Sequence, residues 1–214
     1  MKNKVFTHVG SLMGGMVHNL NTPLMWVMGR AQLLEARNDR METLKDLPEE
    51  EILSIKAKNS KDIASIQDGA SKIDGILKSL GYKIQMINEG YTSIELKEFL
   101  EMEMDFLMAD MRFKHETNRE ISLGGRSCYV KGDYNVLSSC VMGVIDMILS
   151  NTEKGRTLRI GLDNGIIRIG CKELQVTDEI RQKIDAFCRD FSETAEFITD
   201  TADGFLMSVC MKDG

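Results

Sequence analysis

Two ladders of apolar residues cover most of the first ninety positions. Their members recur at steps of three or four, which places them along one face of a helix. The first ladder consists of Val9, Met13, Met16, Leu20, Leu24, Val27, Ala31 and Leu34. The second consists of Ile52, Ile55, Asn59, Ile63, Ile66, Ala70, Ile73, Leu77, Leu80, Ile84 and Ile87, of which only Asn59 is polar. Because the charged segment 38–50, which contains Pro48, separates them, the pattern predicts an antiparallel helical hairpin.

A single hairpin of this kind leaves half of its apolar surface uncovered. Two hairpins cover that surface when they pack together into a four-helix bundle. We therefore expect a homodimer, with residues 1–90 as its dimerisation domain.

The pattern changes after Gly90, and residues 91–214 form the second predicted domain. The clearest local signal is the pair of alternating segments 158–162 and 166–170, which flank Asp163-Asn164-Gly165 and predict a tight β-hairpin. The other predicted elements are strands at 91–96, 119–123, 195–199 and 205–211, and helices at 96–114, 134–150 and 178–191. Together they predict the α+β class with antiparallel strands, in an α/β sandwich in which helices cover one side of a sheet.

Charge and composition exclude several classes of protein. Residues 1–90 carry 12 basic and 11 acidic side chains (+1), whereas residues 91–214 carry 15 and 22 (−7), so no nucleic-acid partner is expected. No apolar run reaches the roughly 18 residues that cross a bilayer, and the N-terminus lacks the apolar core of a signal peptide. Five scattered cysteines without a C-x-x-C pair favour neither disulfides nor a zinc site. We expect a cytoplasmic protein that does not engage a membrane.

His18 is the candidate reactive residue. It lies off the first ladder, two residues after Met16 and two before Leu20, so its ring is expected to face solvent. Its helical neighbours are Ser11, Gly14, Gly15, Asn21, Thr22 and Met25, and all of them except Met25 are small or polar. Each glycine costs a helix about 1 kcal/mol relative to alanine, which indicates that space is kept for a partner, and Pro23 predicts a bend one turn later. The same pattern has an alternative interpretation, in which His18 is an ordinary surface histidine and the glycines let helices pack closely.

Residues 18–24 read His-Asn-Leu-Asn-Thr-Pro-Leu, and together with the flanks Gly10-Ser11-Leu12 and 28–34 they resemble the phosphoacceptor box of bacterial sensor histidine kinases. In that family the histidine lies on the first helix of a dimeric hairpin and becomes phosphorylated. The resemblance extends over about residues 8–88. It implies that His18 is the phosphoacceptor. The predicted surface for docking a partner consists of Ser11, Gly14, Gly15, Asn19, Asn21, Thr22 and Met25.

The second half resembles the ATP-binding domain of the same family in outline only. The helix at 133–151 corresponds to one that carries two asparagines in the family, and here those positions are Gly143 and Met147. The acidic glycine loop that recognises adenine and the glycine-rich lid are both missing. Asn19 replaces the acid that usually follows the phosphoacceptor, and an amide cannot accept a proton as a carboxylate does. Thr22 matches a position that orients water in kinases with phosphatase activity.

These observations favour a histidine phosphotransferase in a two-component phosphorelay, which moves a phosphoryl group between response-regulator aspartates through His18. Most of an unperturbed imidazole is neutral at cytoplasmic pH and can act as the nucleophile. No cofactor is expected in this chain, and Mg²⁺ is expected from the receiver domain of the partner. Two alternatives stay open: an active but diverged sensor histidine kinase fragment, and a non-enzymatic dimeric adaptor. His8 and His115 are interpreted as solvated surface groups, and Trp26 as a packing residue.

Overall fold

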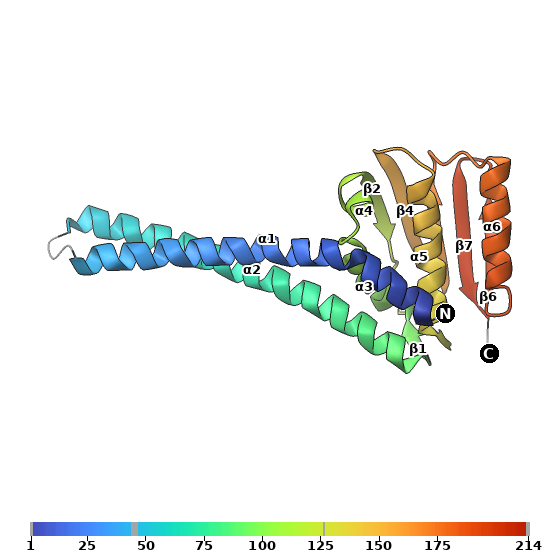
Figure 1. The fold of residues 1–214 in the computed structure, drawn as a ribbon, viewed down its shortest axis with the longest axis horizontal. Helices are drawn as coiled ribbons and strands as arrows, with labels where there is room; N and C mark the ends of the chain where they lie inside the picture. Colours follow the sequence, from blue (N-terminus) through green and yellow to red (C-terminus); the bar gives the residue numbers. More distant parts are fainter. Residues whose placement is uncertain (1, 44–46, 126, 213–214) are drawn as a thin grey trace. The chain divides into compact units, whose positions relative to one another are not determined.

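The computed structural model describes residues 2–43, 47–125 and 127–212, and the chain forms two compact units (Figure 1). Residues 14–78 make up the hairpin unit, and residues 1–13 together with 79–214 make up the α/β unit. The predicted domain boundary at residue 90 lies where the second long helix ends and the first strand begins. The boundaries between the two compact units lie within the two long helices, after residue 13 and after residue 78, so each of these helices contributes to both units.

The two long helices are α1 (Lys2–Thr43) and α2 (Glu49–Glu89), as the apolar ladders predict. Pro23 lies within α1. Three glutamates, Glu49 to Glu51, occupy the first turn of α2, where negative charge interacts favourably with the helix dipole. No candidate for a bilayer-spanning segment occurs among the helices of residues 2–43, 47–125 and 127–212.

The buried positions of the hairpin unit repeat every seven residues. They are Met16 and Pro23 on α1, and Ile55, Asp62 and Gly69 on α2. A Cβ atom on Gly69 would lie 2.7 Å from Cγ2 of Val27 and 3.3 Å from the carbonyl oxygen of Pro23. The two helix backbones therefore approach each other closely at this point, and only glycine fits.

The stripe that is buried inside the hairpin is not the whole apolar ladder. Two members of the predicted ladders, Leu24 and Ile63, keep 44% and 47% of their surface exposed. The sequence pattern thus identifies the apolar side of each helix correctly, but part of that side stays exposed in the single chain.

The α/β unit contains a five-stranded sheet with the strand order β2-β4-β5-β7-β6 and a two-stranded antiparallel pair, β1-β3. Its strands are β1 (Tyr91–Glu95), β2 (Thr117–Ser122), β3 (Tyr129–Asp133), β4 (Arg156–Asp163), β5 (Ile166–Cys171), β6 (Ala195–Asp200) and β7 (Phe205–Met211). Its helices besides the ends of α1 and α2 are α3 (Leu96–Leu107), α4 (Met111–His115), α5 (Tyr134–Ser150) and α6 (Asp178–Asp190). Figure 1 shows α5 and α6 on the same side of the larger sheet, which confirms the predicted α+β class.

The core of this unit lies between the sheet and α5. Alternate residues of β4, namely Leu158, Ile160 and Leu162, are buried, while Arg159 and Asp163 between and after them are exposed. This period of two is the pattern of a sheet with one covered face. The predicted turn at 163–165 is confirmed, since Asn164 and Gly165 have φ angles of 48° and 80° and β4 pairs with β5 in antiparallel register.

Three details of the α/β unit differ from the sequence prediction. The helix predicted at 96–114 is split into α3 and α4, because Asp110 accepts a hydrogen bond from the backbone N–H of Arg112 and starts a new helix there. Strand β3 was not predicted. β2 pairs with β4 in parallel, although the sequence pattern suggested antiparallel strands.

A buried polar network joins the last part of α2 to α3 and α5 inside the α/β unit. Lys83 and Glu103 are each only 1% exposed, and Nζ of Lys83 lies 2.5 Å from Oε2 of Glu103. The hydroxyl of Tyr134 donates a hydrogen bond to the other carboxylate oxygen at 2.5 Å, and Lys83 also contacts Oγ of Ser138 at 3.2 Å. Burial and the charge of Glu103 raise the pKa of Tyr134, so its hydroxyl stays protonated.

Candidate functional site

His18 lies on α1 within the hairpin unit and is exposed, as its position off the apolar ladder predicts. Gly14, Asn21, Thr22 and Met25 are exposed as well, and Met25 keeps 71% of its surface accessible. Their spacing from His18 places all four on its side of the helix. We call these five residues the His18 face. A Cβ atom on Gly14 would meet no other atom within 4 Å, so the space before the imidazole is open.

The other three predicted docking residues lie differently. Gly15 and Asn19 are half-buried rather than exposed. Ser11 belongs to the α/β unit, where its hydroxyl donates a hydrogen bond of 2.7 Å to the carbonyl oxygen of His8. The hydroxyl of Thr22 also donates to the backbone, at 3.1 Å from the carbonyl oxygen of His18. The hydroxyl proton of Thr22 is therefore engaged in a hydrogen bond within α1.

Trp26 follows the His18 face on α1. Its side chain keeps 55% of its surface exposed, and the ammonium group of Lys72 lies 5.4 Å from the centre of the ring. This is a cation–π contact within the hairpin unit. Trp26 is thus more exposed than its interpretation as a packing residue predicts.

An ion cluster lies inside the hairpin, on the buried stripe of α2. Asp62 has a nearly inaccessible side chain, and its two carboxylate oxygens lie 2.8 Å from Arg30 and 2.5 Å from Arg37. Arg37 also donates to Oδ1 of Asn59 at 3.1 Å. The hydrogen bond from Arg37, reinforced by the charges of both arginines, lowers the pKa of Asp62. Asn59 stood out as the one polar member of the second ladder, whereas the ladder pattern did not point to Asp62. The spacing of Arg30 and Arg37, seven residues apart on α1, was the available signal.

Gly143 and Met147, the two positions that the sequence resemblance matches to asparagines, lie on α5. Gly143 is in contact with α6: a Cβ atom on it would lie 2.4 Å from Cε2 of Phe187. The ring of Phe187 packs in turn against those of Phe191 and Phe197, with centroids 5.0 and 5.7 Å away. The space beside Gly143 is thus partly filled by an aromatic cluster. Met147 is half-buried, and its carbonyl oxygen accepts a hydrogen bond from Asn151.

His8 is not the solvated surface group that the sequence suggested. It is half-buried in the α/β unit, and its ring lies 6.2 Å from that of Phe106. Its burial, together with the nearby charge of Lys83, lowers the pKa of His8. His115 is exposed, as expected. The burial of His8 depends on residues about a hundred positions away, so the local sequence carried no signal for it.

No protein-family model matches the sequence, and no curated protein matches it either. Solved structures similar to the chain include a histidine kinase, AdeS, from Acinetobacter baumannii, at 14% identity and a TM-score of 0.42, over 92% of this chain and 98% of that one. The catalytic domain of histidine kinase ThkA aligns with 56% of this chain and 94% of its own, at 15% identity and a TM-score of 0.46. A complex of ThkA with the response regulator protein TrrA aligns with 100% of this chain and 64% of that one, at 12% identity and a TM-score of 0.43. The likeness is one of general outline.

Proposed function

We propose that this chain is a histidine phosphotransferase of two-component signalling, in which His18 carries the phosphoryl group between receiver domains. The observation that carries the proposal is the open, exposed His18 face on a helical hairpin, at a sequence that resembles a phosphoacceptor box. A receiver domain must bring its aspartyl phosphate within bonding distance of the imidazole. A flat helix surface with a glycine one turn away leaves room for that approach.

For the transfer itself, this chain needs to supply only the imidazole nucleophile. A lone pair on a neutral imidazole nitrogen of His18 forms the N–P bond while the P–O bond to the receiver's aspartate breaks, and the carboxylate leaves. The exposed ring can release its remaining proton to solvent. A second receiver domain takes the phosphoryl group by the reverse step. Phosphoryl transfer depends mainly on position and charge neutralisation, and the receiver's acidic site would supply the Mg²⁺.

Two features favour a phosphotransferase over an ATP-dependent kinase. The first is the aromatic cluster: Phe187 packs against Gly143, where the resemblance would require an asparagine and a bound nucleotide. The second is Asn19, whose amide cannot activate the neighbouring His18 as an acid would. A diverged kinase would need other residues to bind the nucleotide and to activate His18.

The proposal includes a homodimer, and the exposed apolar residues of the hairpin support it. Beside the buried stripe, each helix carries a second seven-residue repeat that is apolar and exposed. We call these repeats the outer stripes: Val17, Leu24 and Ala31 on α1, and Ile63, Ala70 and Leu77 on α2. A repeat of seven is the spacing of a helix-bundle seam, so a second hairpin is the partner that fits.

The phosphotransfer test uses purified receiver domains phosphorylated with a small-molecule phosphodonor. Incubation should label this chain with an acid-labile, alkali-stable phosphate, and His18→Gln should abolish the label. His115→Gln is the matched control, because His115 is also exposed, and it should label normally. Gly14→Leu should slow labelling while leaving the imidazole in place. Labelling by Mg-ATP alone would favour the kinase, and failure of every receiver domain from the source organism would favour the adaptor.

The dimer test measures mass by light scattering. The unmodified chain should give about twice 24.1 kDa at micromolar concentration. Placing a charge in the outer stripes, with Leu24→Glu and Ile63→Glu together, should give a monomer that stays helical. Ala57→Glu, at an exposed position of α2 outside the outer stripes, should stay dimeric. A monomeric unmodified chain would contradict the four-helix bundle.

A further inference from the structure

The strand β6 forms one edge of the five-stranded sheet, since it stands last in the order β2-β4-β5-β7-β6. Residues 195–200 pair with β7 on one side only. An edge strand presents backbone N–H and C=O groups to which an extended segment of another chain can bind by strand addition. The direction of each backbone group of β6 decides which of them such a segment would meet.

Two hydrogen bonds fix the direction of these backbone groups. The N–H of Lys212 donates to the carbonyl oxygen of Thr194 at 3.0 Å, so the backbone of Thr194 faces β7. The N–H of Ala195 instead donates to a carbonyl oxygen at the end of α6, at 2.9 Å, so it faces away from β7. Because backbone groups alternate along a strand, Phe197 and Thr199 direct their N–H and C=O groups outward as well. Outside the strand ladders, neither of these two residues forms a backbone hydrogen bond in the part of the chain that the structure describes.

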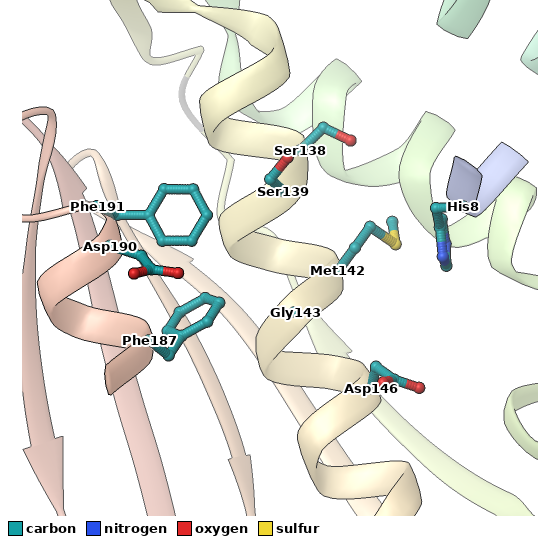
Figure 2. A pocket seen from close by; sticks show the side chains of 9 residues that line it. All are labelled: His8, Ser138, Ser139, Met142, Gly143, Asp146, Phe187, Asp190 and Phe191. Atoms are coloured by element: carbon teal, nitrogen blue, oxygen red, sulfur yellow. The ribbon is translucent and has the colours of Figure 1, made fainter. Parts of the chain in front are cut away.

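Aromatic packing holds the inner face of β6 in place. The centre of the Phe197 ring lies 5.7 Å from that of Phe187 and 6.5 Å from that of Phe191. Figure 2 shows the rings of Phe187 and Phe191 reaching from α6 toward α5, where they line a pocket. The outward backbone groups of β6 thus belong to a packed strand, and a preorganised strand binds a peptide at a lower entropic cost.

The exposed side of β6 is acidic. Glu196, Ile198 and Asp200 alternate along the strand and share one face, and Ile198 keeps 71% of its surface exposed. Residues 191–202 contain three carboxylates and no basic side chain. The three residues opposite this face on β7 are uncharged, and the ammonium group of Lys212 donates to the carbonyl oxygen of Ser192.

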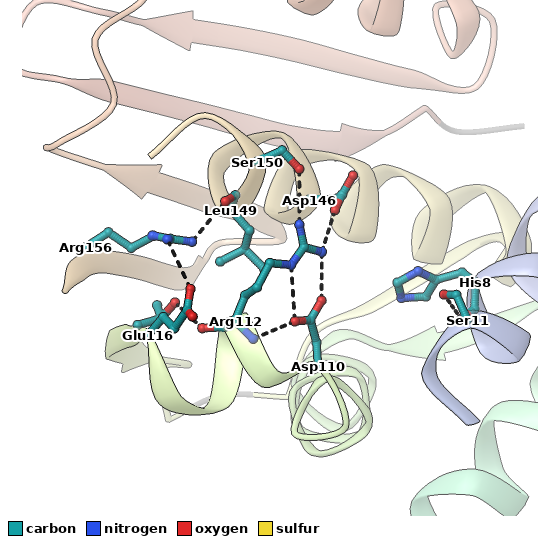
Figure 3. Close-up of polar contacts among 10 residues, drawn as sticks. His8, Ser11, Asp110, Arg112, Glu116, Asp146, Leu149, Ser150 and Arg156 are labelled. Atoms are coloured by element: carbon teal, nitrogen blue, oxygen red, sulfur yellow. Dashed lines mark hydrogen bonds and ion pairs between the residues drawn. The ribbon is translucent and has the colours of Figure 1, made fainter. Parts of the chain in front are cut away.

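Other carboxylates of the α/β unit have basic partners. Arg112 lies 2.8 Å from Asp110 and 2.9 Å from Asp146 (Figure 3). Just beyond β6, Asp203 forms an ion pair with Lys172 at 3.2 Å. The two carboxylates of β6 itself take part in no ion pair among those described. Their negative charge is therefore complementary to a basic partner.

We propose that β6 accepts an extended, basic segment of a partner protein as an additional antiparallel strand. The backbone of the segment bonds to the outward groups of Phe197 and Thr199. Two lysines or arginines, one on each side of an apolar residue and two positions from it, lie opposite Asp200 and Glu196. This inference does not depend on phosphotransfer by His18, which lies in the hairpin unit.

Two other pairings are less favourable. A second copy of β6 would bring its own carboxylates to the same face, and like charges on facing strands destabilise a sheet. The opposite edge strand, β2, carries one arginine and one glutamate, so its charge does not select a basic segment.

The test titrates capped seven-residue peptides into the full chain. The peptide Thr-Lys-Thr-Val-Thr-Lys-Thr has the required alternation of charge. At saturation, amide hydrogen exchange followed by NMR should slow about tenfold at the N–H groups of Phe197 and Thr199. The N–H of Ile198 faces β7 and serves as the internal control, which should not change. A peptide with glutamates in place of the lysines should bind about fivefold more weakly or worse.

Methylation of one backbone nitrogen of the lysine peptide separates strand addition from simple attraction of charge. A methyl group on the third residue removes an N–H that points at β6 and should weaken binding about threefold to tenfold. A methyl group on the central valine, whose N–H points away, should leave the affinity unchanged. In the protein, Asp200→Asn should weaken binding about twofold to fivefold. Asp105→Asn, which removes an exposed carboxylate from α3, should not.

Several results would overturn the proposal. They are equal affinity for the lysine and glutamate peptides, equal losses for the two methylated peptides, slowed exchange at β2 instead of β6, and no binding at millimolar peptide. Slow exchange at Phe197 and Thr199 without peptide, increasing with protein concentration, would identify a second copy as the occupant and would overturn it as well.

Discussion

Replacement of Lys83 by methionine tests the buried network of the α/β unit. Methionine has nearly the length of lysine without its charge, so the change removes the ammonium group and leaves the carboxylate of Glu103 buried. Only the hydroxyl of Tyr134, 2.5 Å away, would then remain as a donor to that carboxylate among the bonds described. Breaking a buried ion pair on one side costs about 3–5 kcal/mol, a large share of the roughly 5–15 kcal/mol by which domains are stable.

The double variant Lys83→Met/Glu103→Leu separates the two contributions to that cost. Without either charge, the network loses its electrostatic attraction and its desolvation penalty together, and such exchanges are often close to neutral. What remains is the hydroxyl of Tyr134 without its acceptor, which costs about 1–3 kcal/mol. The double variant should therefore be more stable than Lys83→Met alone.

The assay is urea unfolding followed by circular dichroism, with hydrogen exchange of α5 to assign the transition to the α/β unit. The midpoint should fall while the dependence on urea stays the same, because the surface exposed on unfolding is unchanged. Lys78→Met is the control, since Lys78 is exposed and, among the ion pairs described, forms a salt bridge only to Asp74 in the preceding turn. It should change stability by less than about 0.5 kcal/mol. A loss below about 1 kcal/mol in Lys83→Met, or a double variant less stable than the single one, would refute the reasoning.

Two further predictions concern His8 and Gly143. The pKa of His8 is lowered from 6.5 in the folded chain, so the unfolded chain binds more protons as the pH falls below about 6.5; urea midpoints should drop with pH there, and His8→Gln should flatten that slope. An equal slope in both proteins would contradict the burial of His8. Gly143→Ala should destabilise the chain by about 1–3 kcal/mol in a thermal melt, because its Cβ would lie 2.4 Å from Phe187, instead of stabilising the helix by about 1 kcal/mol. A raised melting temperature would show that Phe187 moves aside freely.

In the hairpin unit, the hydrophobic pattern of the sequence predicted the helices but not which of their residues are buried. The two ladders predicted both long helices, because a period of three to four depends only on the helix itself. They did not predict which ladder positions would be buried in one chain, since an internal seam and a seam for a second copy have the same spacing. Asp62 was not predicted for a related reason. A carboxylate can lie on the buried stripe only because Arg30 and Arg37 of the other helix form ion pairs with it.

The α/β unit shows a different limit. The turn at Asn164-Gly165 was predictable because its backbone angles depend on two residues alone. The break before α4 also had a local signal, since Asp110 is a good N-terminal cap, but the apolar pattern on both sides concealed it. The environment of His8 had no such signal, because its ring packs against Phe106, which is about a hundred positions away in the sequence.

For the candidate site, the position of His18 off the apolar ladder predicted its exposure, and the sequence already showed that Gly143 and Met147 carry no amide group. It could not predict that Phe187 would pack against Gly143, because that contact joins two helices separated by a hairpin of strands. Residue types thus indicated that amide side chains are missing from these positions. The structure was needed to show that the ring of Phe187 packs against Gly143.

The placement of Trp26 gives the hairpin a built-in optical reporter. It is the only tryptophan of the chain, and it lies eight residues after His18, or about 12 Å along the helix axis. Its indole is half exposed beside Lys72, so its emission responds to water and to the nearby ammonium group. A protein that settles on the His18 face and covers the indole would shift this emission to shorter wavelength. Unlabelled chain can therefore report the docking of a tryptophan-free receiver domain, the partner of the proposed function, in a stopped-flow fluorimeter, separately from any transfer of phosphate.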